Sequence, residues 1–290
     1  MKKVLITAID SFTGRHLSKY LVKSGYEVVG TTRHTCDITK KDDITKILKD
    51  TSPDYIIHLA AISFASHGKE EDFYKINTIG TTNLLDSILE VSLNPSKIII
   101  VSSATVYGNL GFELLDESLC CKPSNHYGAS KYSMETLTRN YFTKLPILIT
   151  RPFNYTGVGQ ADHFLIPKIV KHYKERKKVI ELGNLDVSRE FNDIIYVCEV
   201  YKRLLEVEDR SIVVNICSNK AIKLLNIIDL MNEIAGYKIE VKVNPAFVRK
   251  DEIKTLTGNT TKLFDIIGNV EQNDFYHLLK SIYENKYKSS

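Results

Sequence analysis

A tyrosine and a lysine stand four residues apart, at Tyr127 and Lys131, near the expected start of a helix. Residues i and i+4 share one face of a helix, so the ammonium of Lys131 is expected near the phenol of Tyr127. A nearby cation lowers the pKa of a phenol, which makes Tyr127 a usable proton donor or acceptor closer to neutral pH. Ser103 ends an expected strand and is placed to hydrogen-bond an oxygen on which negative charge develops. The three side chains predict catalysis at a carbonyl carbon.

The same spacing occurs twice more, at Tyr173/Lys177 and Tyr276/Lys280, so spacing alone does not identify a catalytic pair. Only the first pair follows a strand-then-helix pattern in which a strand ends at serine 24 residues before the tyrosine. We therefore interpret the other two pairs as exposed helix faces.

Composition excludes several classes of protein. The chain has 290 residues, 43% hydrophobic content and a net charge of +4, which allow a substantial core and do not require nucleic acid. The basic run from Lys171 to Lys178 is interpreted as an exposed helix face. No apolar stretch approaches the length of a membrane span. The odd number of cysteines and their spacing predict neither a metal site nor a secreted disulfide framework, so we expect a cytoplasmic protein.

The first half alternates apolar runs with helical patterns. Strands are expected at about 3–8, 27–32, 55–59, 97–102 and 146–151, and helices at about 13–24, 42–49, 70–92 and 127–143. The strands are continuous apolar runs, which is typical of strands buried on both faces of a parallel sheet. This order predicts an α/β fold with a doubly wound parallel (Rossmann) sheet, in which ligands bind beyond the carboxyl ends of the strands.

The pattern changes after residue 154. We expect residues 1–154, joined by about 193–217, to form an NAD(P)-binding Rossmann domain. Residues 155–192 and 218–290 are expected to form a smaller C-terminal α/β lobe that binds the substrate over the first domain.

The first strand-to-helix turn contains Ala8, Ser11, Phe12, Thr13 and Gly14, which we predict to bind the phosphates of a dinucleotide. Such turns usually carry three glycines, and only Gly14 is present. Alanine at position 8 is tolerable if its φ angle is negative, and Ser11 is expected to donate to a phosphate.

The second strand ends in Thr31-Thr32-Arg33, without the acidic residue that usually holds the ribose hydroxyls of NAD. Arg33 is suited to pair with a 2′-phosphate, so Thr32 and Arg33 favour NADP, with NAD as the alternative.

These features resemble those of the extended short-chain dehydrogenases/reductases, the NAD-dependent epimerase/dehydratase family, that act on nucleotide sugars. The resemblance covers nearly the whole chain and rests on Asp37-Ile38, His58-Leu59-Ala60-Ala61, Asn77 with Gly80-Thr81, Ser102-Ser103, Tyr127-x-x-x-Lys131, Arg151-Pro152-Phe153-Asn154 and Arg189-Glu190-Phe191-x-Asp193. It implies that cofactor contacts come from Asp37, Ile38, Leu59, Ala60, Ala61, Asn77, Tyr127 and Lys131. It implies that substrate contacts come from Ser103, Thr105, Asn154, Arg189, Arg249 and Glu252. Asn77 is equally interpretable as a cap.

Within that family, the dehydratases carry an Asp-Glu pair where this chain has Ala104-Thr105, so dehydration is not expected. The second half is similar to GDP-4-keto-6-deoxy-mannose reductases. The favoured hypothesis is therefore reduction of the C4 keto group of a GDP-linked 4-keto-6-deoxyhexose, with Tyr127 as proton donor. The alternatives are a nucleotide-sugar 4-epimerase with tightly bound NAD and a non-catalytic nucleotide-binding module. The resemblance also implies a homodimer that pairs helices 70–92 and 127–143.

Overall fold

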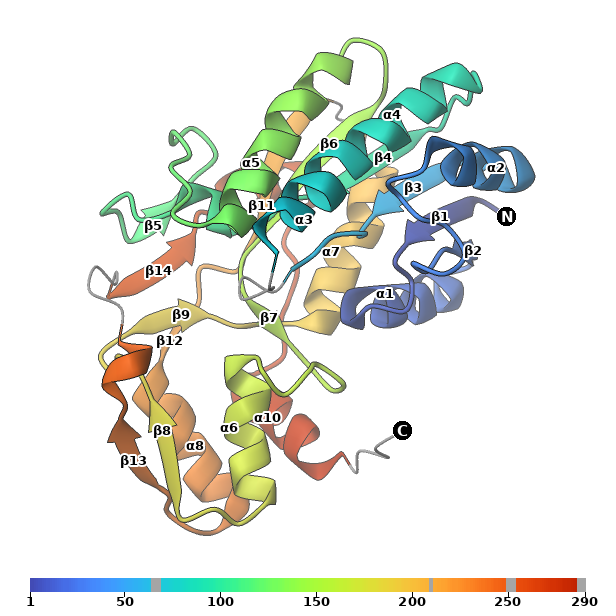
Figure 1. The fold of residues 1–290 in the computed structure, drawn as a ribbon. Coiled ribbons are helices and arrows are strands. Elements are labelled where there is room, and N and C mark those ends of the chain that lie inside the picture. The colour runs from blue at the N-terminus through green and yellow to red at the C-terminus, as the bar shows by residue number, and fades with distance from the viewer. Residues whose placement is uncertain (64–68, 209–210, 249–253, 286–290) are drawn as a thin grey trace.

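A six-stranded parallel sheet forms the centre of the protein, seen in a computed structural model that describes residues 1–63, 69–208, 211–248 and 254–285 (Figure 1). The strand order is β11-β6-β4-β3-β1-β2, and every neighbouring pair is parallel. The strands are β1 (Lys3–Thr7), β2 (Glu27–Gly30), β3 (Tyr55–His58), β4 (Lys97–Val101), β6 (Ile147–Pro152) and β11 (Ile212–Ile216). The doubly wound Rossmann-type sheet predicted from the sequence is confirmed.

Helices cover both faces of this sheet, which explains why its strands are continuous apolar runs. One face packs against α1 (Phe12–Lys23), α7 (Ile194–Glu206) and α9 (Thr261–Ile267). The other packs against α2 (Lys41–Thr51), α4 (Gly80–Glu90) and α5 (His126–Thr138). Ile98, Ile99 and Ile100 of the central strand β4 are fully buried between these two layers.

A second hydrophobic core lies in the lower part of Figure 1. Its elements are α6 (Leu165–Lys174), β8 (Val179–Leu182), α8 (Leu224–Ala235), β13 (Glu240–Val243) and α10 (Phe275–Glu284). The division into two lobes at the expected residues stays a prediction, and one segment crosses it. Leu263, Ile267 and Val270 belong to the core of the large sheet rather than to the second core.

Short strands connect the two parts of the protein, and those labelled β7, β9 and β14 lie between the two cores in Figure 1. They form a four-stranded sheet in the order β12-β9-β14-β5 and a separate pair, β10-β7. The strands are β5 (Leu114–Leu115), β7 (Tyr155–Thr156), β9 (Ser188–Glu190), β10 (Asn192–Asp193), β12 (Ala221–Lys223) and β14 (Thr255–Gly258). We call the four-stranded sheet the connecting sheet, because its strands come from segments on both sides.

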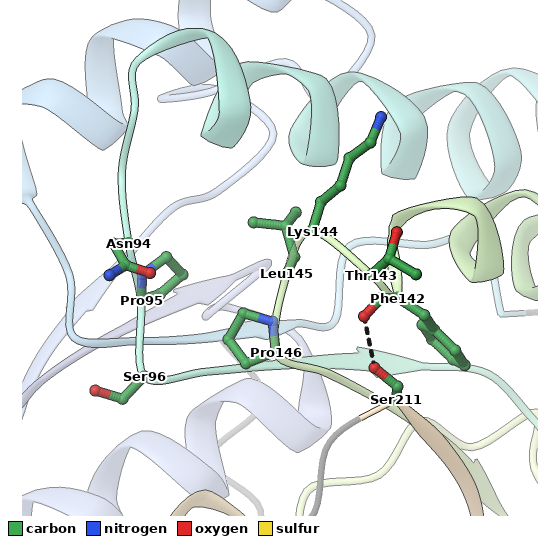
Figure 2. A pocket seen from close by; sticks show the side chains of 9 residues that line it. All are labelled: Asn94, Pro95, Ser96, Phe142, Thr143, Lys144, Leu145, Pro146 and Ser211. Atoms are coloured by element: carbon green, nitrogen blue, oxygen red, sulfur yellow. Dashed lines mark hydrogen bonds between the residues drawn. The ribbon is translucent and has the colours of Figure 1, made fainter.

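A cavity of about 350 Å³ lies at the amino-terminal edge of the large sheet, among the segments that precede β4, β6 and β11 (Figure 2). The Ser211 Oγ donates a hydrogen bond to the carbonyl of Phe142 at 2.7 Å there. Ligands of doubly wound sheets bind at the opposite, carboxyl-terminal edge, so this cavity is not the candidate site. Among the described helices, none is long and apolar enough to cross a membrane.

Candidate active site

Ser103 lies immediately beyond the carboxyl end of β4, where the chain turns into a short 3₁₀ helix, Ala104–Tyr107. Its Oγ accepts from the Thr105 backbone N–H at 3.1 Å and lies 2.9 Å from the Thr105 hydroxyl. The two hydroxyls therefore face one point at the edge of the sheet. Thr105, which the resemblance implies as a substrate contact, also orients Ser103.

Tyr127 lies in the first turn of α5, which Asn125 caps by accepting from the Gly128 N–H at 2.9 Å. A Cβ on Gly128 would come within 2.9 Å of the Thr105 carbonyl oxygen, so only glycine lets the helix approach the turn after β4 this closely. That approach brings Tyr127 near Ser103, whose side chain acts to lower the pKa of the phenol. The two side chains therefore lie in the same part of the site, beyond the end of β4.

The electrostatics of Tyr127 differ from the expectation. Burial raises the pKa of Tyr127 to about 12, and the hydrogen bond from Ser103 only partly opposes this. The expectation that Lys131 lowers the pKa of Tyr127 is therefore wrong, because desolvation of the phenolate outweighs the effect of the neighbouring groups. At neutral pH the phenol is protonated, as a proton donor must be.

Lys131 is buried at 4% exposure, and its Nζ donates to the Val101 carbonyl at 2.7 Å, at the end of β4. Burial lowers the pKa of Lys131 to about 8, against the opposing effect of Glu135 one turn further along α5. The ammonium is thus fixed beside the strand end that carries Ser103, on the same helix as Tyr127.

A buried ion pair fixes the catalytic helix to the sheet. Arg151 on β6 donates from Nε and Nη2 to the two carboxylate oxygens of Glu135 at 2.9 and 2.7 Å. Both side chains are buried, and the guanidinium lies 4.8 Å from the centre of the Tyr107 ring. This bidentate pair sets the position of α5 relative to β6.

The predicted phosphate turn has the expected place but not the expected backbone. Ser11 is the N-cap of α1 and accepts from the Gly14 N–H at 3.1 Å. A Cβ on Gly14 would lie 2.5 Å from the Ala8 carbonyl oxygen, so the turn requires glycine there. Ala8 has φ +52°, so the condition under which alanine would be tolerable at this position is not met. Alanine carries the strain that glycine relieves at this point.

A cavity of about 340 Å³ runs along the carboxyl ends of β1, β2 and β3. It is lined by Thr7, Ala8, Thr31, Thr32, Arg33, Cys36, Asp37, Ile38, Thr39, Ala60, Ala61, Ile62, Asp72, Lys75 and Ile76. Of the predicted cofactor residues, Ala8, Thr32, Arg33, Asp37, Ile38, Ala60 and Ala61 are brought together here. Asp72 and Lys75 were not predicted. The sequence did offer one indication: the two residues are three positions apart in an expected helix, so their side chains share one face of it.

Arg33 is exposed at this cavity. Within the described chain, no acidic side chain pairs with its guanidinium. Thr32 is held by its neighbour, because its N–H donates to the Thr35 hydroxyl at 2.8 Å. The loop therefore presents a positive group directly after the second strand, and the first acid that follows in the cavity is Asp37.

Asp37 is oriented by its own loop. Its Oδ1 accepts from the Thr39 N–H and hydroxyl, and the N–H in particular lowers the pKa of Asp37. Ile38 is buried beneath Gly80 of α4, where a Cβ would meet Ile38 at 2.8 Å. These contacts hold one end of the cavity as a fixed surface.

A directional chain of hydrogen bonds fixes the loop after β3. The Ala60 N–H donates to the Thr7 hydroxyl, which lies 2.9 Å from Nδ1 of His58. The Thr81 hydroxyl donates to the Asn77 carbonyl, so it accepts from Nε2 of His58 at 3.0 Å. This network assigns the neutral Nε2–H tautomer. Burial lowers the pKa of His58 to about 3, which keeps it neutral.

Asn77 lies in a π-helical segment, Tyr74–Ile79, and is fully buried. Its Oδ1 accepts from the Ile62 N–H at 2.8 Å, while Nδ2 donates to the Ser130 hydroxyl at 3.0 Å. Asn77 thus joins the loop beside the cavity to the catalytic helix, and it does not cap a helix. π-helical turns of this kind are frequent at functional sites.

Tyr155 is a residue of this site that sequence reasoning missed. Its hydroxyl lies 2.8 Å from the Thr13 hydroxyl, and its ring stacks on Phe12 at 6.2 Å between centroids. Its charge would raise the pKa of Tyr127, so the two phenols influence each other electrostatically. The available signal was its position directly after Asn154.

Of the other predicted substrate residues, Arg189 lies on β9 and Asn154 directly precedes β7. Asn154 is exposed and precedes β7, and its carbonyl accepts from the Asn192 N–H at 2.8 Å. The Nη1 of Arg189 donates to the carbonyls of Ser188 and Lys254 at 2.7 and 3.3 Å. Arg249 and Glu252 lie outside the described residues.

The interpretation of the other two Tyr-x-x-x-Lys pairs as exposed helix faces is wrong for the first of them, because Tyr173 is buried and Lys177 lies beyond the end of α6. Tyr173 is buried in the second core, where its hydroxyl donates to Asn232 at 2.8 Å. Lys280 pairs with Glu284 on the surface of α10. Neither pair lies at the carboxyl edge of the large sheet.

The site fits a dinucleotide on the observations above. The helix α1 presents its capped N-terminus beside the strained Ala8 turn, and the 340 Å³ cavity continues from it along the strand ends. Ser103, Tyr127 and Lys131 adjoin the end of β4 in the same edge. Among the described residues, no group of three or more metal-binding side chains is found.

Comparison with known proteins gives a consistent picture. A model described as the NAD dependent epimerase/dehydratase family matches residues 4–217. The GDP-6-deoxy-D-talose 4-dehydrogenase of Aggregatibacter actinomycetemcomitans is 37% identical over 99% of this chain and 97% of the relative. The GDP-6-deoxy-D-mannose reductase of Pseudomonas aeruginosa is 29% identical over 92% of this chain and 91% of the relative. The structure of RMD from Pseudomonas aeruginosa complexed with NADPH has a TM-score of 0.89 and 26% identity, covering 98% of both chains.

Proposed function

Because the chain belongs to the NAD-dependent epimerase/dehydratase family, we propose that it is an NAD(P)-dependent nucleotide-sugar oxidoreductase. Its reaction is reduction of the C4 keto group of a GDP-linked 4-keto-6-deoxyhexose. The observation that carries this proposal is the convergence of Ser103, Tyr127 and Lys131 at the carboxyl end of β4, beside a cavity suited to a dinucleotide.

In this mechanism, a bound reduced nicotinamide supplies the hydride that no side chain can provide. Tyr127 donates its phenolic proton to the substrate oxygen, which becomes the hydroxyl of the product. Its raised pKa of about 12 keeps the phenol protonated until that oxygen gains charge. Ser103 donates a hydrogen bond to the same oxygen, and its orientation is set by Thr105. Lys131 holds its charge beside the strand end and is placed to bind the cofactor ribose.

The absence of carboxylates at Ala104 and Thr105 agrees with reduction rather than dehydration. Elimination of water from the sugar requires an acid and a base at the reacting carbons. A methyl group and a hydroxyl at these positions provide neither. The substrate is therefore a sugar that already carries a keto group.

NADPH is the proposed reductant. The exposed guanidinium of Arg33 at the cavity and the lack of an acid at the end of β2 favour a 2′-phosphate over a free 2′-hydroxyl. The relative RMD has been solved with NADPH. NADH is the alternative reductant.

The GDP portion of the substrate is proposed from the named relatives, both of which act on GDP-linked 6-deoxyhexoses according to their names. Asn154, Arg189, Arg249 and Glu252 are the proposed contacts. An arginine offers a planar fork of donors that suits a diphosphate.

The decisive experiment follows absorbance at 340 nm with purified protein and a GDP-4-keto-6-deoxyhexose generated by a dehydratase. Stoichiometric loss of NADPH, faster than that of NADH, is expected. Separation of the two possible C4 epimers then identifies the product as a 6-deoxytalose or a rhamnose derivative. No loss of reductant, together with NAD released from the denatured protein, would favour the 4-epimerase. Absence of both would leave a non-catalytic nucleotide-binding module.

We also propose that the protein is a homodimer and that it is located in the cytoplasm. Phe73, Leu84 and Ile88 are buried within the chain's own core, whereas Ile79 and Leu137 are 51% and 38% exposed on the predicted pairing helices. All five cysteines are free, which suits a reducing compartment. Sedimentation at micromolar concentration is expected to give twice the mass of 33.0 kDa. A monomer alone would contradict the dimer.

A further inference from the structure

Glu190, at the end of β9, is a fully buried carboxylate, and within the described residues no cation lies at hydrogen-bond distance from it. Its Oε1 accepts from the N–H groups of Gly258 and Asn219 at 2.6 and 3.1 Å. Its Oε2 accepts from the Ser218 N–H at 2.9 Å and from the Asn192 side-chain amide at 3.1 Å. Four N–H donors therefore satisfy one buried charge.

These donors belong to three separate segments. Gly258 ends β14, Ser218 and Asn219 form the turn after β11, and Asn192 begins β10. Glu190 therefore ties the large sheet, through the end of β11, to the connecting sheet and to the β10-β7 pair.

Two of the proposed substrate contacts depend on these segments. Arg189 is the residue next to Glu190, and on either side it is paired with Leu256 of β14 and Ile222 of β12. Asn192 carries the link onward, because its N–H donates to the Asn154 carbonyl at 2.8 Å. The Ser218 hydroxyl in turn donates to Oδ1 of Asn192 at 2.5 Å. One carboxylate thus sets the backbone beneath both Arg189 and Asn154.

We propose that Glu190 is a positioning residue for the nucleotide-sugar diphosphate, acting through Arg189 and Asn154 rather than by touching the substrate. This inference rests on the proposed function. Glutamine is the informative replacement, because it keeps the shape but turns one oxygen into an N–H group. The new N–H group would then point at two N–H donors, and those donors require an acceptor at that position.

The test compares binding of two ligands to the full chain. Calorimetric titrations with GDP and with NADPH are run on the wild type, Glu190→Gln and a control, Asn232→Ala. Asn232 holds the second core through Tyr173 and the Ile239 N–H, and in the described part of the chain its side-chain hydrogen bonds reach none of the segments joined by Glu190. The control therefore reports general loosening of that lobe.

Glu190→Gln is expected to weaken GDP binding roughly tenfold or more and to raise the KM for the nucleotide sugar by a similar factor. Affinity for NADPH and kcat should stay within about threefold, because the cofactor cavity and Tyr127 are not touched. The Asn232→Ala control should lower the thermal midpoint and leave GDP affinity within about twofold.

Unchanged GDP affinity in Glu190→Gln, or an equal loss for NADPH and for GDP, would overturn the positioning role. A wild type that binds no GDP would instead overturn the proposed function, and the inference with it. If Glu190→Gln does not fold, Ser218→Ala removes only the hydroxyl on Asn192. It should weaken GDP binding by roughly threefold without affecting NADPH, and no change would again overturn the role.

Discussion

The reacting side and the substrate side of the site are built in different ways. Ser103 follows β4, and Tyr127 and Lys131 lie on α5, which packs against the large sheet. Arg189 and Asn154 lie on or beside strands of two or three residues. On the reacting side a cation, Arg151, balances the buried carboxylate of Glu135. On the substrate side four N–H groups balance that of Glu190.

The difference shows two solutions to placing functional groups. A long helix against a parallel sheet fixes side chains through packing, and an ion pair sets its position. Short strands bury little apolar surface, so hydrogen bonds to a buried polar group are needed to hold them together. The first arrangement should fail by losing stability, and the second by losing substrate affinity.

Glu135→Gln gives the largest expected effect. It leaves the buried guanidinium of Arg151 without its charge partner, and its Nη1 already lacks a hydrogen bond. Breaking such a pair costs about 3–5 kcal/mol of unfolding free energy. Urea denaturation measures the loss, with Glu190→Gln beside it. Since no cation is stranded at position 190, an equal loss in both variants would remove the distinction between the two sides.

Tyr127→Phe tests the reacting side directly. Removing the proton donor should lower kcat by roughly 10³-fold, within the range for general acids. NADPH affinity should change by less than about twofold, because the ring and its packing on Phe73 remain. Stopped-flow absorbance at 340 nm measures the rate. Turnover at the wild-type rate would show that Tyr127 is not the donor.

Arg189→Ala tests the substrate side. Loss of a charge-assisted contact of about 1.5–3 kcal/mol should raise the KM for the nucleotide sugar by roughly 10–100-fold. The value of kcat should change little, in contrast to Tyr127→Phe. Steady-state kinetics at saturating NADPH separate the two constants. A fall in kcat with KM unchanged would move Arg189 to the reacting side.

The pH dependence of cofactor binding sharpens the role of Lys131. Its lowered pKa of about 8 means that the ammonium loses its proton as the pH rises through that value. If the charged form binds the cofactor, NADPH affinity should be constant below pH 8 and fall by up to about tenfold per unit above it. Fluorescence titrations from pH 7 to 9.5 measure the slope. Lys131→Met should bind more weakly with no such slope, and a sloping Lys131→Met would assign the titration to another group.

Ala8→Gly is the smallest expected effect. Glycine relieves the left-handed backbone at φ +52° but gains freedom in the unfolded chain, so the net stabilisation should be about 0.5–1 kcal/mol. Thermal unfolding without cofactor measures it. Destabilisation would mean that the alanine methyl contributes more by packing than its backbone costs.

Much of the reacting side could be predicted from the sequence. Continuous apolar strands and the i, i+4 pair at Tyr127 and Lys131 are local patterns, and strand ends in a parallel sheet share one edge. The pKa of Tyr127 could not be predicted, because it depends on burial by segments distant in the chain. The positive φ angle of Ala8 likewise results from the close packing of Gly14 against the turn. An alanine in the sequence gives no indication of a positive φ angle.

The substrate side was less accessible to prediction. Glu190 belongs to a short sequence motif, yet the groups that donate hydrogen bonds to it lie up to 68 residues away in the sequence. Tyr155 contacts Phe12 and Thr13 across more than 140 positions. Hydrophobic periodicity cannot predict such contacts, because a strand of two residues is too short to show an alternation of apolar and polar residues.

The connecting sheet has a mechanical consequence. β5 arises between β4 and α5, yet it pairs with β14, and β14 pairs with β9. Rotation of the second core away from the large sheet would have to break these backbone hydrogen bonds, unlike the hinge closure of proteins whose domains are joined only by linkers. Entry and release of a bulky substrate should therefore depend on local rearrangement of loops at the rim, and turnover should be insensitive to changes that stiffen the connecting sheet.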